Sequence, residues 1–117
     1  MTSNISDIQK TIDNKSDALN FLLVALIASN SRFQRYYPLS QLFNYQLGLF
    51  PDLLNTLKHL VNQGWLRHTS EPEKPAIYQI TPLGQEELSQ VDMDSVFQQL
   101  EEDVKNTKLL SALQKML

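Results

Sequence analysis

The stretch from residue 49 to residue 88, LFPDLLNTLKHLVNQGWLRHTSEPEKPAIYQITPLGQEEL, decides the fold of this chain of 117 residues. Its pattern predicts a helix, a strand, a tight loop, a second strand and a second helix, in that order. This order places a β-hairpin between two helices, and the rest of the chain is interpreted around it.

The first helix of this stretch begins near Asp52 and ends before Gly64. From Leu53 to Val61, apolar residues recur at the three-and-four spacing that lines one helical face. Pro51 followed by Asp52 suits a helix start, because a fixed φ and a carboxylate fit the unpaired amides there. Gly64 suits a left-handed cap at the other end. We therefore expect an amphipathic helix between these two signals.

The hairpin follows this helix directly. Residues 65–67 are interpreted as a short strand, and residues 76–81 alternate in polarity as a returning strand. Between them lies a polar run with two prolines, which cannot continue a ladder and therefore marks the hairpin tip. Thr81 and Pro82 fit a cap and a first helical position, so the last helix of the stretch is expected to begin there.

The preceding part of the chain predicts two more helices. Asp17 can cap a helix that runs to about Asn30 and is apolar nearly all round, which indicates a buried central helix. Residues 33–38 are aromatic and predict a short, extended first strand. A second helix that ends at Gly48 is indicated by four apolar residues, Leu39, Leu42, Phe43 and Leu47.

Three segments are expected along the chain. Residues 1–15 form a flexible or partly helical N-terminal segment, in which Ile5, Ile8 and Ile12 indicate a turn or two that can dock. Residues 16–90 form the main domain. Residues 91–117 form a C-terminal helix, whose apolar residues keep near-helical spacing with acids opposite.

Charge is distributed unevenly, although the formal net charge is only −3. Residues 31–81 hold five bases and three acids, whereas residues 82–117 hold three bases and seven acids. A local basic surface can attract phosphate even in an acidic protein, because the local field governs the approach. The excess is small, so it favours weak or dimer-dependent binding to nucleic acid.

Composition argues against several other classes of protein. The chain has no cysteine and therefore neither a disulfide framework nor a thiolate metal site, which makes the cytoplasm the expected location. The longest apolar run, residues 21–28, is about eight residues against the roughly twenty that span a bilayer, so no membrane association is expected. His59 and His68 have no partners at metal-ligand spacing. Without a phosphate loop or a catalytic constellation, we expect no enzyme activity, no metal and no cofactor.

The aromatic residues between positions 36 and 50 are a separate feature. They can line a ligand pocket, but packing of a small core explains them more simply, and no small-molecule effector is assigned. These residues are Tyr36, Tyr37, Phe43, Tyr45 and Phe50.

Residues 17–90 contain two motifs, Leu57-Lys58-His59-Leu60 with Gln63-Gly64-Trp65-Leu66, and Tyr78-x-Ile80-Thr81-x-x-Gly84-x-x-x-Leu88. These motifs resemble those of the winged-helix transcriptional regulators of bacteria, above all the PadR-like group, with the MarR-like group as second choice. The first resembles the family's recognition helix and its exit, and the second resembles the end of its wing. The chain has Tyr36-Tyr37-Pro38 where PadR regulators have a glycine-tyrosine motif after the first helix.

The resemblance implies a mainly α fold with a small β-hairpin (α+β), a winged helix-turn-helix with an additional C-terminal helix. It also implies a homodimer on double-stranded DNA, paired through the helix of residues 91–117. The alternative for that helix is that it folds back on its own domain. The alternative function is a winged-helix module that binds protein and not DNA, which the thin basic surface favours.

In such regulators the third helix enters the major groove and the wing lies on the backbone or in the minor groove. If the apolar residues of the third helix face the core, Asp52, Asn55, His59 and Asn62 lie opposite and form the reading face. Asp52 is interpreted mainly as a helix-start residue, and exposed Asn and His can also be merely solvated. The candidate DNA-binding residues are Asn55, Lys58, His59, Arg67 and Lys74.

Overall fold

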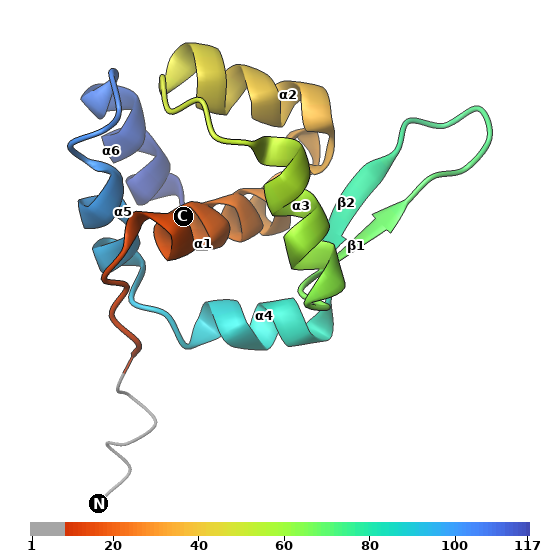
Figure 1. Cartoon of the computed structure of the whole chain (residues 1–117), viewed down its shortest axis with the longest axis horizontal. Helices are drawn as coiled ribbons and strands as arrows, with labels where there is room; N and C mark the ends of the chain where they lie inside the picture. Colours follow the sequence, from red (N-terminus) through yellow and green to blue (C-terminus); the bar gives the residue numbers. More distant parts are fainter. Residues whose placement is uncertain (1–8) are drawn as a thin grey trace, which may run out of the picture.

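A computed structural model describes residues 9–117 and shows a mainly helical protein with one antiparallel hairpin, so the predicted α+β class is confirmed. In Figure 1 the hairpin projects from one end of the helical body. The elements in chain order are α1 (Lys15–Ser29), the 3₁₀ turn η2 (Ser31–Gln34), α2 (Tyr36–Ser40), the π-helical η3 (Gln41–Gln46), α3 (Leu53–Asn62), β1 (Leu66–Thr69), β2 (Ile77–Ile80), α4 (Pro82–Ser89), α5 (Met93–Leu100) and α6 (Thr107–Met116).

Helix α1 is the centre of the core, as its all-round apolar pattern predicts. The seven consecutive residues from Phe21 to Ile27 are all buried. Its N-cap differs from the prediction, because the side chain of Asn14 accepts a hydrogen bond from the Asp17 N–H at 2.8 Å. Asp17 therefore lies in the first turn, where its carboxylate complements the helix dipole instead of capping the end.

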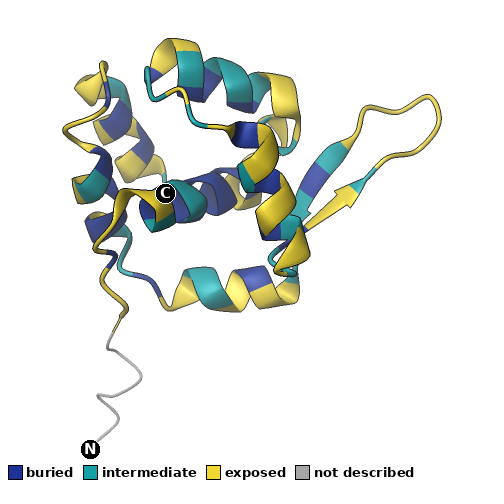
Figure 2. Cartoon of the chain, viewed as in Figure 1, coloured by how far each residue is buried: buried dark blue, intermediate teal, exposed yellow. Residues whose placement is uncertain are grey.

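The other elements cover α1 on several sides (Figure 2). Helix α5 packs along it, and η2, β2 and α4 contact it elsewhere. The chain before α1 also joins the core: Ile12 is buried, and its N–H donates to Ser95 Oγ on α5 at 2.8 Å. Ile5 and Ile8, which were predicted to dock in the same way, lie outside the described residues.

The strand predicted for residues 33–38 is wrong, because this segment coils into η2 and α2. The side chain of Asn30 accepts a hydrogen bond from the Arg32 N–H at 2.9 Å and starts the 3₁₀ turn. Pro38 lies in the first turn of α2, where a helix leaves its amides unpaired in any case, so the proline does not oppose helix formation. Leu39 on the same helix is fully buried, which fixes the helix against the core.

Helix α3 and the hairpin form as predicted. Gly64 has a φ of +84° and ends the helix region, and the two strands pair from Leu66 with Ile80 to Thr69 with Ile77. Thr81 caps α4 by accepting from the Gly84 N–H at 3.0 Å, with Pro82 at the first position. A Cβ on Gly84 would collide with the Trp65 carbonyl oxygen, so this glycine permits the close approach of α4 to the start of the hairpin.

The single C-terminal helix predicted for residues 91–117 is wrong, because the segment forms two helices, α5 and α6. Val96 and Leu100 of α5 and Leu110 of α6 are buried in the core of their own chain. The intervening loop is held by Asp103, whose carboxylate pairs with Lys15 at 2.8 Å and raises the pKa of that lysine by hydrogen bonding and charge. This arrangement is the alternative in which the segment folds back on its own domain.

The aromatic residues of positions 36–50 do not all serve packing. Phe43 is buried as expected, but Tyr37 and Tyr45 are 71% and 75% exposed. Tyr36 and Phe50 are also exposed, so the prediction that the whole cluster packs in the core is wrong for four of its five members. The helix formed by α2 and η3 turns only one face inward, and the tyrosines lie on the outer one. No helix within residues 9–117 has the length and apolar character that a bilayer crossing requires.

Replacing Leu57 by alanine tests the packing of α3. Its side chain is fully buried, so L57A is expected to lower the free energy of unfolding by about 2–5 kcal/mol. Leu54 on the same helix is 60% exposed, and L54A is the matched control that should change stability little. Urea denaturation followed by circular dichroism measures both, and equal effects of the two variants would contradict the orientation of α3.

Candidate nucleic-acid interface

The outer face of α3 is polar and free of the core. Leu53, Leu57 and Leu60 are buried on one side of the helix, and four side chains are exposed on the other. Leu54 borders this face and is the apolar exception on it. The exposed residues are Asn55, Lys58, His59 and Asn62. The four residues predicted from helical periodicity, Asp52, Asn55, His59 and Asn62, are thus all exposed, and Lys58 joins them.

Asp52 and Asn55 form a small network at the start of α3. The Asp52 carboxylate accepts from the Asn55 N–H at 3.3 Å and from its side-chain Nδ2 at 3.0 Å. Asp52 is thus the N-cap, and it also holds the Asn55 amide in one orientation. The carbonyl oxygen of that amide keeps its capacity to accept, and its second N–H keeps its capacity to donate, so the groups that a bidentate contact to adenine uses remain available.

Lys58 and His59 follow one turn later on the same face. Both are exposed, and within residues 9–117 neither forms an ion pair. Lys58 therefore contributes a positive charge that a phosphate can approach without displacing a protein carboxylate. His59 contributes two ring nitrogens for hydrogen bonding.

Arg67 is the cation of the hairpin itself. It lies on β1 opposite Gln79, and its Nη2 donates to the Gln79 Oε1 at 3.2 Å across the ladder. This bond leaves most of the guanidinium donors unused and orients the group along the outer face of the hairpin.

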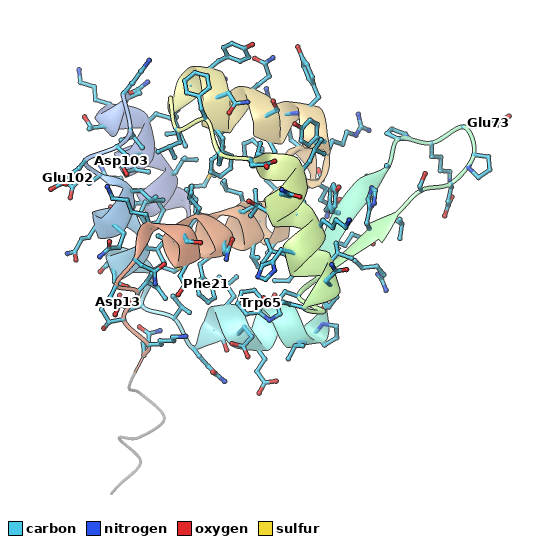
Figure 3. All side chains as sticks on the ribbon, viewed as in Figure 1. Asp13, Phe21, Trp65, Glu73, Glu102 and Asp103 are labelled. Carbon is cyan, nitrogen blue, oxygen red and sulfur yellow. The ribbon has the colours of Figure 1, made fainter. Side chains whose placement is uncertain are left out.

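The hairpin tip is less basic than the sequence suggested. Lys74 forms an ion pair with Glu71 at 3.2 Å, and Glu73 beside it adopts a positive φ of 68° in the turn. Figure 3 shows Glu73 at the far end of the hairpin. With two acids and one base, the tip carries a net negative charge, so a phosphate at Lys74 has to compete with Glu71 for the ammonium group.

Two further cations lie near the hairpin and were not among the predicted site residues. Arg32 and Arg35 line a cavity of about 370 Å³ that also includes Ile77 of β2. The charge count of residues 31–81 contained both arginines, but no motif singled them out. Their position depends on the fold, because η2 and β2 are far apart in the sequence and adjacent in space.

The acids at the far end of the C-terminal segment do not cancel this local charge. The longest dimension of the molecule is 53 Å, and Glu102 and Asp103 lie at the end opposite the hairpin tip (Figure 3). Exposed charges are largely screened beyond roughly 8 Å at physiological salt, so these two acids contribute little to the field near the hairpin.

Two aromatic contacts fix the hairpin to the body and brace it. The rings of Phe21 on α1 and Trp65 lie 5.2 Å apart and join the base of the hairpin to the core (Figure 3). Further out, His68 and Tyr78 stack across the strands at 4.2 Å, and burial raises the pKa of Tyr78. Because α3 also packs on β1, the position of the exposed helix face relative to the hairpin is fixed.

Comparisons with protein families, with curated proteins and with solved structures found no match. The geometry of the described residues therefore has to support any functional conclusion. In that part of the chain, no group of three or more His, Asp or Glu side chains is placed to hold a metal ion.

Replacing Asp52 separates the contribution of its capping hydrogen bond to the stability of α3 from the contribution of its negative charge. D52A removes the N-cap and is expected to lower the free energy of unfolding by about 1 kcal/mol, whereas D52N keeps a capping oxygen and should cost less. Thermal denaturation of the two variants measures this difference. Equal destabilisation by D52A and D52N would show that charge, and not capping geometry, is what the helix start requires.

Proposed function

We propose that this chain is a DNA-binding transcriptional regulator with a winged helix-turn-helix fold, similar to the PadR-like regulators. Helix α3 is the element for the major groove, and the hairpin is the wing on the backbone or in the minor groove. The observation that supports this proposal best is the exposed polar face of α3 next to a braced hairpin.

The proposed contacts divide into two kinds. Asn55 and His59 are the candidates for base recognition, because their side chains can donate and accept at base edges. Lys58, Arg67 and Lys74 are candidates for phosphate, with Lys74 the weakest of them because it is paired with Glu71. So few cations give a single chain only modest affinity, and a dimer that places two such surfaces on one duplex compensates for this.

We propose that the dimer forms at the C-terminal end of α6. Most apolar residues of α5 and α6 are buried in their own chain, but Met116 is 52% exposed. It borders a groove of about 260 Å³ whose other lining residues are Ala25, Ala28, Ser29, Gln85, Leu88, Met93 and Leu117. An apolar groove of this kind is a suitable surface for a second copy of the chain.

A protein-binding module is the second candidate function. Besides the three exposed tyrosines of α2 and η3, Phe50 and Leu54 are 62% and 60% exposed at the start of α3. Large apolar side chains beside the proposed reading face favour contact with another protein, since DNA offers them few apolar partners.

DNA binding is tested by fluorescence anisotropy on duplexes from the promoter region of the protein's own gene, at several salt concentrations. The double variant K58A/R67A is expected to weaken binding to all sequences and to reduce the log–log salt slope by about two per chain. The variant N55A/H59A should instead relax sequence preference by about 1–3 kcal/mol for each true base contact.

The matched control is K10A/K108A, which removes two exposed cations outside the hairpin, one before α1 and one in the first turn of α6, away from the proposed dimer interface. It should leave affinity and salt slope close to those of the natural chain. No salt-dependent binding by the natural chain at low salt would overturn the DNA proposal and favour the protein-binding module.

Dimerisation is tested by light scattering coupled to gel filtration at micromolar concentration. M116E places a charge in the proposed interface and is expected to give a monomer with an unchanged melting temperature. S111E places the same charge elsewhere on the exposed surface of α6 and should remain a dimer. A natural chain that is already monomeric under these conditions would contradict the proposed dimer.

A further inference from the structure

In the described part of the chain, no strand pairs with the outer edge of β2, so backbone groups on that edge lack a strand partner. The Thr81 N–H donates to the Trp65 carbonyl at 3.0 Å, which sets the alternation of the antiparallel ladder. Arg67 with Gln79 and Thr69 with Ile77 are therefore the hydrogen-bonded pairs. The N–H and C=O of Tyr78 then point away from β1, and the same alternation directs those of Ala76 outward.

A groove lies next to β2 at Ile77, between Ala76 and Tyr78 in the chain. The cavity of about 370 Å³ is bounded by Ile77 on the strand and by residues of η2 and α2 on the other side. Residues 33–38 coil into η2 and α2, and no backbone hydrogen bond joins these elements to β2 in residues 9–117. The η2 and α2 lining consists of Ser31, Arg32, Gln34, Arg35 and Pro38.

The groove is positively charged and carries no acid in its lining. Arg32 and Arg35 are its only charged residues, and both are exposed. Among the described residues neither guanidinium forms an ion pair or a side-chain hydrogen bond, so all their donors are available to a ligand. Two unpartnered guanidiniums favour carboxylate groups, which they can bind in bidentate form.

We propose that this groove binds an extended, acidic segment of a partner protein, which adds to β2 as a third strand. The outward groups of Ala76 and Tyr78 would supply main-chain hydrogen bonds, and Arg32 and Arg35 would bind the carboxylates of the segment. Ile77 and Pro38 provide apolar walls for its other side chains. This site is separate from the proposed reading face of α3 and does not depend on DNA binding.

The strand edge and the apolar walls are the reason for proposing a peptide and not a nucleic acid. Phosphates would use the two guanidiniums but leave the outward amide and carbonyl groups unpaired. An extended peptide satisfies both sets of groups at once. Charged side chains at an open edge also limit edge-to-edge association of copies, so the arginines select for an acidic strand.

The test is fluorescence anisotropy with a labelled peptide in which glutamate alternates with valine, about six residues long, the length of a typical strand. R32A/R35A is expected to raise the Kd about tenfold or more, because each charge-assisted hydrogen bond is lost. K108A/K115A, which removes equal charge from α6, should leave the Kd within about twofold, a shift under 0.5 kcal/mol. Melting temperatures establish that all variants are folded.

A second probe tests strand addition itself. The same peptide with methylated backbone nitrogens keeps its charge but cannot donate to a strand, so it is expected to lose binding. No binding of the unmodified peptide, or equal binding of the methylated one, would overturn the proposal. It would also be overturned if duplex DNA required Arg32 and Arg35 while the peptide did not, which would identify the groove as a phosphate surface. The salt slope of K58A/R67A on DNA reports separately on the reading face.

Discussion

Burial of α1 is the constraint on which the rest of the structure depends. Beyond its first turn the helix has no ionisable residue, and Phe21 to Ile27 are buried without interruption. If any side of this segment faced water, each Å² of exposed apolar surface would cost roughly 25 cal/mol of stability. The chain therefore has to surround α1, and it does so with α5 along it and with η2, β2 and α4 at other positions. This requirement explains why the C-terminal segment folds back instead of extending as one free helix.

The same constraint positions the candidate interface. Trp65 packs on Phe21 of α1, and the hairpin that follows Trp65 is therefore anchored to the centre of the core. Helix α3 buries Leu57 and Leu60 and must turn Asn55, Lys58 and His59 outward. The polar face is thus a consequence of the apolar one. The helix formed by α2 and η3 does not have one apolar and one polar face, and aromatic side chains such as Tyr37 and Tyr45 remain in solvent.

Local charge differs from what composition alone suggests. The formal charge of −3 is that of the whole chain, but the acids Glu102 and Asp103 lie at the end opposite the hairpin. Near the hairpin, Arg67 is bonded to Gln79, whereas Lys74 is neutralised by Glu71. The available positive charge therefore shifts from the tip toward the base of the hairpin and toward η2. That shift is the reason for assigning separate partners to the α3 face and to the groove beside β2.

The sequence by itself determined the elements whose signals are local. The spacing of Leu53, Leu57 and Leu60, the turn at Gly64 and the cap at Thr81 predicted α3, the hairpin and the start of α4. Tertiary structure decided the rest, because the competing local preferences of residues 33–38 and 91–117 are resolved only by what they pack against. Leu39 and Phe43 gain burial only if their segment coils, and Val96 and Leu110 gain it only if the C-terminal segment bends back onto α1. The groove formed by Arg32, Arg35 and Ile77 belongs to the same class, since no local pattern shows that residues about forty positions apart in the chain will become neighbours.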